Sequence, residues 1–255
     1  TKMQGGIIVN EIMKLMENHR SVRRYTDQEI AGELLTSILK VSQSASTSSN
    51  LQAYSIIVLR DKERKSKLAE LCGNQRYIED CPVFLVFCGD LSRIDYCGEK
   101  YGRKANLDHT EPFLMTSIDA ALIAQNVLLA AESEGLGGVF IGGIRNNSQE
   151  VSDLLKLPDL VYPVFGMCIG YPDHSKLPGT KPRLPLEAIV HEEEYSETKK
   201  EKHIEEYDRT MLDYYRTRPQ AARDESWSAY VSKVYEKPKR MHLKGFLENK
   251  KFGLK

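Results

Sequence analysis

Apolar positions along the chain fall into two patterns. Short continuous runs predict strands, and residues spaced three and four apart predict helices. Strands are predicted at 53–59, 82–88, 137–143 and 161–171. Helices are predicted at about 8–16, 30–39, 61–71, 113–134, 150–157, 202–215, 226–235 and 239–248. The segments between strands vary widely in length, which favours an α+β fold with a central mixed or antiparallel sheet flanked by helices over a regular doubly wound fold.

Local signals sharpen some of these boundaries. Thr26 stands three residues before Glu29, the spacing of a capping box, and predicts the start of the second helix. Gly135 follows the long apolar helix where a C-terminal glycine belongs. The strand at 82–88 is almost wholly apolar, which indicates that both of its faces are covered. The segment 91–112 is polar and without a clear period, so no element is predicted there.

The charge balance excludes one class of partner. The 255 residues include 36 Lys plus Arg and 36 Asp plus Glu, so no net positive field attracts nucleic acid. Hydrophobic residues make up 41% of the chain, enough for a substantial core without a disulfide or metal staple. The longest apolar stretch, 113–131, contains Asp119, which indicates a buried helix and not a membrane span.

The five cysteines indicate the compartment. No CxxC pair occurs, which fits neither a disulfide framework nor a zinc site. Reduced thiols are typical of the cytoplasm, and residues 1–6 contain no apolar stretch like that of a signal peptide. We therefore expect a cytoplasmic protein that binds no metal and no membrane.

Familiar catalytic motifs are absent. The glycines between 135 and 143 satisfy neither GxGxxG nor the phosphate-binding P-loop. No GxSxG elbow or HExxH pair occurs either. A Cys/His or Ser/His nucleophilic set could be assembled only from six scattered histidines, so no such set is predicted.

Three polar segments point to one kind of ligand. The run His19 to Arg23 alternates cationic and hydroxyl donors, which suits a phosphate monoester. Lys181 and Arg183 flank a proline in a stiff loop and can close on an anion. The hydroxyl run 44–49 can line the edge of a planar heterocycle. Each segment alone also fits an ordinary solvated turn. Together they describe a pocket for a phosphorylated heterocycle.

The order of these segments carries a resemblance. The chain reads HRSVR at 19–23, SASTSSNLQAYSII at 44–57, GNQ at 73–75, AAESEGLGGVFIGGIRN at 130–146, KPRLP at 181–185 and YYRTR at 214–218, with a later Trp. From about Glu11 to Phe252 it resembles the FMN-dependent nitroreductase superfamily. More closely, it is similar to the bacterial NADPH-preferring nitroreductase and flavin reductase branch.

The resemblance implies a set of FMN-binding residues. The phosphate motif corresponds to His19, Arg20, Ser21, Val22 and Arg23, and the loop that closes over the phosphate to Lys181, Pro182 and Arg183. The segment beside the ribityl chain and ring edge corresponds to Ser46, Thr47, Ser48 and Ser49. A glutamine that bonds the isoalloxazine corresponds to Gln75, and the strand beside the flavin to Phe140, Ile141, Gly142 and Gly143.

The resemblance also implies a reductant and an assembly. Arg218 and Arg223 are similar to an arginine pair that recognises the 2′-phosphate of NADPH, although the intervening Pro219–Ala222 departs from the family pattern and leaves the preference over NADH open. In this family FMN lies at a homodimer interface to which both chains contribute. We expect a core at 7–185 and a C-terminal helical extension at 186–255, within one domain, that embraces the partner.

The implied activity is FMN-dependent oxidoreduction. Hydride passes from NADPH to flavin N5, and two electrons then reduce a nitroaromatic, a quinone, an azo compound or free flavin in a ping-pong cycle; the flavin carries the chemistry. A dedicated reductase that supplies free reduced flavin is an alternative. A flavin-binding sensor or carrier without turnover is an alternative from another class, and it would lack the dinucleotide site.

Overall fold

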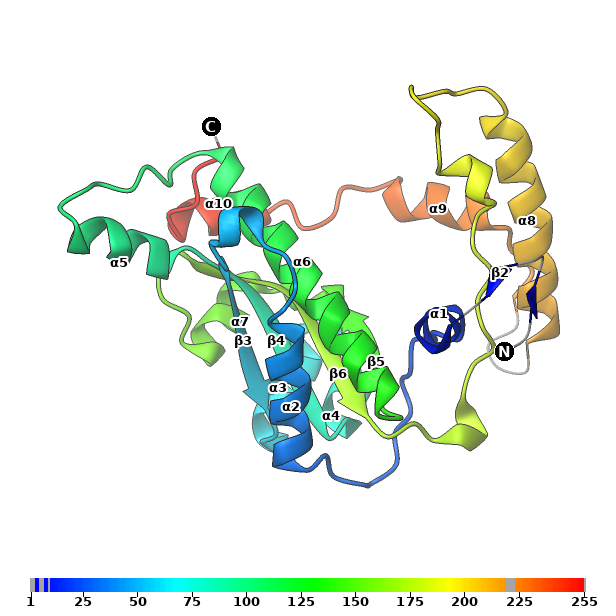
Figure 1. The fold of residues 1–255 in the computed structure, drawn as a ribbon, viewed down its shortest axis with the longest axis horizontal. Coiled ribbons are helices and arrows are strands. Elements are labelled where there is room, and N and C mark those ends of the chain that lie inside the picture. The colour runs from blue at the N-terminus through cyan, green and yellow to red at the C-terminus, as the bar shows by residue number, and fades with distance from the viewer. Residues whose placement is uncertain (1–2, 5–6, 9, 219–222, 255) are drawn as a thin grey trace. The chain divides into compact units, whose positions relative to one another are not determined.

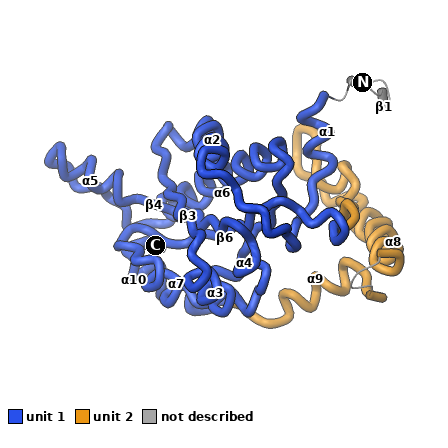
Figure 2. The backbone as a smooth tube through the Cα atoms, turned by 90° about the horizontal axis from the view of Figure 1, so that it is seen from below, with its two compact units in different colours: residues 1–177, 240–255 blue, residues 178–239 orange. Residues whose placement is uncertain are grey.

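The computed structural model describes residues 3–4, 7–8, 10–218 and 223–254. The chain divides into two compact units, residues 1–177 with 240–255 and residues 178–239, coloured separately in Figure 2. The first unit contains the sheet and its covering helices, and the second contains two helices and the segments that lead to them.

The main sheet has four strands in the order β3–β4–β6–β5, and every neighbouring pair is antiparallel. The strands are β3 Tyr54–Leu59, β4 Val83–Asp90, β5 Gly137–Ile141 and β6 Val161–Gly170. The four predicted strands are confirmed, and the choice between a mixed and an antiparallel sheet resolves to antiparallel. Two short strands, β1 Met3–Gln4 and β2 Ile7–Ile8, pair separately, so the prediction that the first helix includes Ile8 is wrong.

The helices of the first unit are α1 Glu11–Glu17, α2 Gly32–Ser42, α3 Lys62–Leu71, α4 Tyr77–Asp80, α5 Ser92–Lys100, α6 Thr110–Ser133, α7 Ser148–Leu155 and α10 Leu243–Asn249. Single 3₁₀ turns are η1 Ser48–Asn50, η2 Gly142–Arg145 and η3 His174–Lys176. Helix α5 lies in the segment for which no element was predicted; it is short, polar on average and has no buried residue.

The predicted capping box at Thr26 and Glu29 is wrong. Helix α2 begins at Gly32 and has no side-chain cap. The backbone N–H of Thr26 instead donates to Tyr171 O at 2.9 Å, which holds the chain extended beside the end of β6. A cross-strand bond therefore prevails over the local capping signal.

Alternation along the strands builds a two-sided core. Val83, Leu85 and Phe87 of β4 pack in one apolar cluster with α2 and α6, and Phe84 and Val86 pack in the other with α3, α4 and α7. Every residue of β4 is buried, as its apolar composition predicts. Figure 1 shows α6 and α2 in front of the sheet, with α3, α4 and α7 behind it.

Helix α6 is the longest element and ends with the expected glycine geometry. Gly135, just beyond it, has a φ of +75°, a conformation that favours glycine. By length and composition α6 is apolar enough to cross a membrane. Its buried residues nevertheless include the carboxylate of Asp119, and it packs against β4 and α2 as a core helix of this unit.

The second unit is organised around α8 Lys200–Thr217 and α9 Trp227–Tyr235, preceded by the 3₁₀ turn η4 Leu186–Ala188. Tyr207, Met211 and Tyr215 form its small apolar core, and the Trp227 ring packs edge-on to Tyr207 at 5.3 Å. The carboxylate of Asp208 accepts the backbone N–H of Ser228 at 2.8 Å, which ties the start of α9 to α8.

Candidate active site

The basic run lies in an extended segment beside the sheet. The Val22 N–H donates to Gly138 O at 2.9 Å, and the Tyr25 hydroxyl donates to Val22 O at 2.7 Å. Gly137 permits this approach, because a Cβ there would lie 2.5 Å from the Val22 Cγ2. The buried Val22 side chain therefore fixes the segment, and its polar neighbours are presented from a rigid backbone.

The side chains of the run have few internal partners. His19 Nδ1 lies 2.6 Å from Glu132 Oε1 on α6. Arg20 is half-buried, and among the described residues its guanidinium has no carboxylate or carbonyl partner. Arg23 is exposed, donates to the carbonyl of Ser21 at 3.3 Å and also interacts with Tyr77. Neither arginine is neutralised by a carboxylate, so both remain available to an anion.

Three distant segments meet beside this run. The Arg23 guanidinium lies 5.9 Å from the centre of the Tyr77 ring, and the Tyr77 hydroxyl donates to Gln75 Oε1. Gln75 Nε2 donates to Cys72 O at 2.6 Å, and a Cβ on Gly143 would stand 2.3 Å from that Nε2. The structure thus brings Arg23, Gln75 and Gly143 together. The missing side chain of Gly143 makes room for the Gln75 amide.

Burial raises the pKa of Tyr77 above its ordinary value of 10.0, although the nearby Arg23 guanidinium acts in the opposite direction. The phenol is therefore neutral at physiological pH and serves as the donor to Gln75. An amide nitrogen carries two hydrogens, and Cys72 O takes one of those on Gln75 Nε2. The second is left for a ligand.

The glycine-bracketed strand ends earlier than predicted. β5 stops at Ile141, and Gly142 and Gly143 open the 3₁₀ turn η2, so the strand prediction through residue 143 is wrong. The Phe140 side chain is 38% exposed and packs edge-on to Phe165 at 5.4 Å. Ile141 is buried in the opposite face of the sheet, so only its backbone faces the turn region.

The hydroxyl run is held by a carboxylate on α6. Asp119 accepts the backbone N–H of Ser48 and that of Ala53, each at 3.0 Å. Thr47 Oγ1 accepts the Gln52 N–H at 3.3 Å, and the side chains of Ser46, Ser48 and Ser49 are exposed. Ser49 has a φ of 47°, part of a tight turn. Sequence reasoning assigned no role to Asp119, yet a lone carboxylate inside an apolar run was a usable signal.

The basic run and the hydroxyl run lie apart within one chain. Their anchors on α6 are Glu132 and Asp119, which the helical rise separates by about 20 Å. The sequence predicted a single pocket lined by both runs. Within one chain, the two runs do not meet at a common position on α6.

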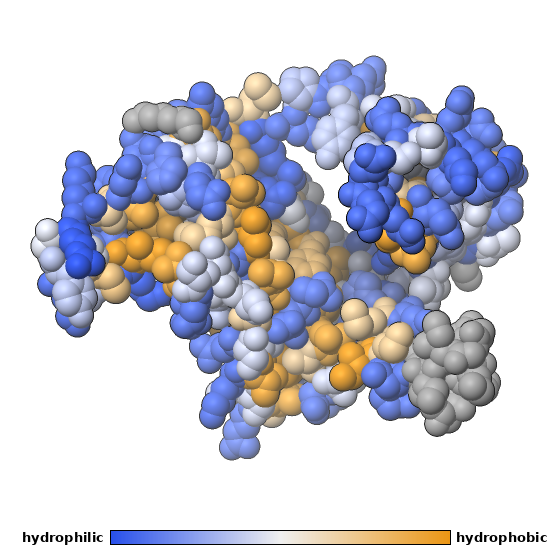
Figure 3. Space-filling model, turned by 45° about the horizontal axis from the view of Figure 1, so that its top comes forward, coloured by the Kyte–Doolittle hydropathy of each residue, from blue (hydrophilic) through white to orange (hydrophobic). Residues whose placement is uncertain are grey.

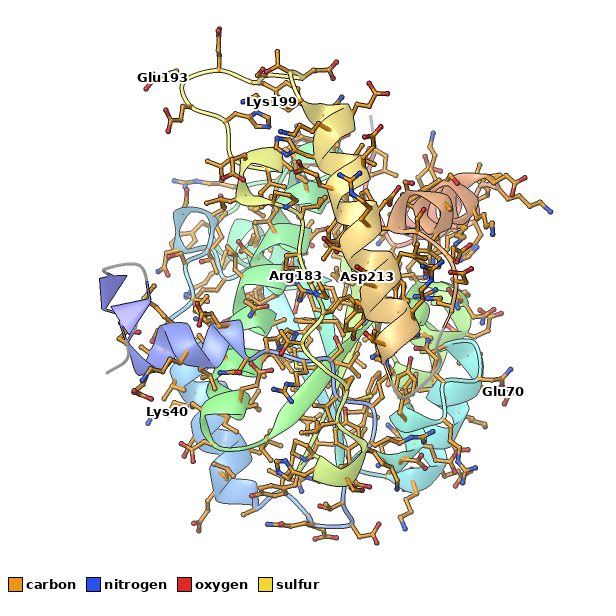
Figure 4. The ribbon with its side chains drawn as sticks, turned by 90° about the vertical axis from the view of Figure 1, so that its right-hand side faces the viewer. Lys40, Glu70, Arg183, Glu193, Lys199 and Asp213 are labelled. Atoms are coloured by element: carbon orange, nitrogen blue, oxygen red, sulfur yellow. The ribbon has the colours of Figure 1, made fainter. Side chains whose placement is uncertain are left out.

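The second unit holds the remaining predicted residues. The Tyr207 hydroxyl on α8 donates to Pro182 O at 2.9 Å, and Arg183 donates to Lys181 O at 3.0 Å. Figure 4 labels Arg183 on the extended segment that runs beside α8. The prediction that this loop closes on the same phosphate as the basic run joins two units and stays a prediction.

Arg218 and Arg223 meet on one aromatic ring. Their guanidinium carbons lie 4.7 Å and 4.0 Å from the centre of the Tyr215 ring, and Arg223 also lies 4.9 Å from the Tyr230 ring. The intervening Pro219–Ala222, noted for its departure from the family pattern, lies outside the described residues. The pair predicted from sequence is thus brought together, and the tyrosines that hold it were not predicted.

Two protein-family models match this chain. The model of the nitroreductase family matches residues 16–171, and the model of the nitroreductase family C-terminal domain matches 181–255. The chain belongs to the nitroreductase family. The matched ranges contain every site segment described above.

Individual nitroreductase-family relatives match over almost the whole chain. The FMN reductase (NADPH) of Bacillus subtilis is 43% identical and covers 96% of this chain and 99% of its own length. The NADPH-flavin oxidoreductase of Vibrio harveyi is 39% identical and covers 95% and 98%. The solved structure of the NfrA1 nitroreductase from B. subtilis superposes with a TM-score of 0.90 at 41% identity, covering 95% and 99%.

Proposed function

We propose that this nitroreductase-family chain is an NADPH-dependent FMN oxidoreductase that works as a homodimer. The names of its full-length relatives support the activity. The observation that carries the proposal is the meeting of Arg23, Gln75 and Gly143, from three distant segments, through Tyr77.

The donor set of the basic run fits the phosphate of FMN. Arg20 and Arg23 have no carboxylate partners among the described residues, and Ser21 adds a hydroxyl donor. Arginine forks form bidentate, charge-assisted bonds to phosphate. His19 is braced by Glu132, which fixes where the run begins. Lys181 and Arg183 would add cations from the second unit.

The turn region fits the ring of the cofactor. Gln75 retains one amide hydrogen, and its partners Tyr77 and Cys72 O fix the direction of that hydrogen. Phe140, on β5 just before the turn η2, offers a partly exposed aromatic ring. When bound, FMN supplies the redox chemistry, and the chain binds and orients it. No side chain needs to act as an acid or a base.

The separation of the hydroxyl run supports a dimer. If a second copy lies across α6, the hydroxyl run of one chain can complete the basic run of the other. An apolar stripe suits this contact: Leu114, Ile118 and Leu122 recur four residues apart on α6 and are 44–49% exposed. Figure 3 shows apolar side chains gathered at the surface of the first unit.

Visible spectroscopy tests the activity directly. The purified protein, loaded with FMN, should show flavin absorption that bleaches anaerobically with NADPH. Colour should return on addition of a nitroaromatic, a quinone or free flavin, and the relative rates identify the acceptor class. A protein that takes up no FMN contradicts the proposal. A flavoprotein that NADPH does not bleach supports the sensor or carrier alternative. Fractionation of cells tests the expected cytoplasmic location.

A matched pair of variants tests the phosphate assignment. Arg23→Ala should lose most of its flavin, because a charge-assisted fork to phosphate disappears. Arg24→Ala, one residue on, should keep its flavin, because the guanidinium beside the Tyr77 ring of the candidate site is that of Arg23, whereas that of Arg24 lies 3.9 Å from Asp80. Flavin content per chain is read from the absorption spectrum. Full flavin in Arg23→Ala contradicts the assignment.

A further inference from the structure

The two arginines near the end of α8 are positioned by aromatic rings. Arg218 and Arg223 both place their guanidinium carbons within 5 Å of the centre of the Tyr215 ring. Guanidinium planes stack favourably on aromatic faces. Tyr215 is 4% exposed and packs with Tyr207 and Met211, so its ring is a fixed platform.

Arg223 contacts a second ring as well. The Tyr230 ring on α9 lies 4.9 Å from the Arg223 guanidinium, against 4.0 Å for Tyr215. Tyr215 lies in the last turn of α8 and Tyr230 belongs to α9, so the arginine is held by two helices of the same unit.

The neighbouring carboxylates do not neutralise this arginine. Asp224 is bound by Arg216, with Oδ1 at 2.7 Å from Nε. Glu225 is bound by Lys233 at 2.6 Å and reaches Arg223 only at 3.9 Å. Each acid thus has a closer basic partner, which leaves the charge of Arg223 available.

One atom of Arg223 lacks a partner. Its Nε is buried and has no hydrogen-bond partner among the described residues. Buried polar atoms are nearly always paired, so an unpaired donor is a reason to expect a ligand. A buried, unpaired N–H on a guanidinium whose nearest carboxylate lies 3.9 Å away suits a phosphate oxygen.

We propose that Tyr215 and Tyr230 are positioning residues that clamp Arg223, with Arg218 on the same platform, and thereby set the selectivity for NADPH over NADH. This inference rests on the proposed function, which supplies the dinucleotide. Both arginines are stacked before the 2′-phosphate arrives, so binding orders fewer side chains. Selectivity then depends on the rings as much as on the arginines.

The exposed ring gives the cleaner experiment. Tyr230 is 43% exposed, so Tyr230→Leu should fold. In the FMN-loaded enzyme it should raise the KM for NADPH about fivefold and leave kcat and the NADH parameters within about twofold. Tyr230→Phe keeps the ring and should retain the parent KM. Tyr235→Leu, on the same helix and 83% exposed, is the matched control and should change nothing.

The buried ring gives the larger effect. Tyr215→Leu should lower the NADPH-to-NADH ratio of kcat/KM about tenfold or more, because both arginines lose their platform. Tyr215→Phe should restore the ratio. If Tyr215→Leu does not fold, the Tyr230 series decides alone.

A binding measurement separates this inference from the proposed function. Adenosine 2′,5′-bisphosphate should bind the parent more tightly than adenosine 5′-monophosphate, and Tyr230→Leu should remove most of that difference, read by calorimetry without turnover. If Tyr230→Leu raises the KM for NADPH and NADH equally, or leaves the NADPH-to-NADH ratio of kcat/KM unchanged, the proposed clamp is wrong. The proposed enzymatic function is not affected by that result. A parent enzyme that oxidises neither nucleotide overturns the proposed function itself.

Discussion

The two units hold arginine side chains in place in different ways. In the first unit, Val22 and Gly138 join the basic run to the sheet by a backbone bond, and close packing at Gly137 fixes it. In the second unit, Arg218 and Arg223 are held by stacking on Tyr215. Residues fixed by the sheet lose their position only when the sheet is disrupted. Side chains fixed by stacking can be displaced, with a loss of ligand selectivity, while the protein stays folded.

A pair of glycine substitutions tests this contrast with the largest expected effect. At Gly143 a Cβ would stand 2.3 Å from Gln75 Nε2 and 2.5 Å from Cys72 O. Gly143→Ala should therefore destabilise the protein by about 2 kcal/mol and lower its flavin content. At Gly179, in the second unit, the nearest atom to a Cβ is a Tyr214 ring carbon at 3.8 Å. Gly179→Ala should fold and bind flavin normally. Urea unfolding and flavin absorption measure both, and equal stabilities would contradict the contrast.

Two carboxylates that join segments give a middle-sized test. Asp119 is 1% exposed and accepts two backbone N–H groups, those of Ser48 and Ala53. Asp119→Ala should cost about 3 kcal/mol and weaken FMN binding, since buried donors are left unpaired. Asp208 is half-buried and holds one residue, Ser228. Asp208→Ala should cost about 1 kcal/mol. Chemical denaturation measures both losses of stability. A larger loss for Asp208→Ala than for Asp119→Ala would contradict this prediction.

Acid stability gives the smallest test. Burial by itself raises the pKa of Asp90, but hydrogen bonds from Ser55 and Ser92 and the charge of Arg93 lower it more, so its pKa falls below the ordinary 3.8. The folded state then binds this proton less readily than the unfolded chain. The stability that Asp90 contributes is present above about pH 4 and is lost as the pH falls through the folded pKa.

Substitutions on each unit isolate that effect. Asp90→Asn should flatten the fall in stability between about pH 5 and pH 2. Glu197, in the second unit, also has a lowered pKa through its bond to Lys200, but its side chain is 72% exposed. Glu197→Gln should leave the acid limb unchanged, because exposed ion pairs contribute little. Thermal melts across this range measure both slopes, and parallel curves for Asp90→Asn and the parent would refute the assignment.

Sequence predicted the elements better than their ends. The strand at 161–171 and the helix at 113–134 were found because long periodic or apolar runs are strong signals. The capping box at Thr26 failed because a bond to Tyr171, 145 positions along the chain, outweighs a local preference. Helix α5 was missed because it is short, polar on average and contributes no buried residue, so its few apolar positions give a weak signal.

The residues of the candidate site were predicted singly, and their assembly was not predicted. Arg23, Gln75 and Gly143 were proposed through a family resemblance, and their juxtaposition is visible only in three dimensions. The tyrosines that contact the arginines could not be predicted, for a different reason. Tyr77 and Tyr215 act through ring faces, and one tyrosine among 13 carries no sequence signal for that role.

The order of strands in the sheet has a consequence for how the chain reaches its folded state. β4 is central, and its pairing with β6 joins residues 71 to 86 positions apart, from Asp90 with Val161 to Val83 with Ile169. No two adjacent strands of this sheet form a tight hairpin, so local contacts cannot nucleate it. During synthesis the largely apolar β4 stays unpaired on that side until Gly170 has been made. Over that interval α6 is the element that can bury β4. The rate at which β6 pairs with β4 then determines how long β4 is exposed to aggregation.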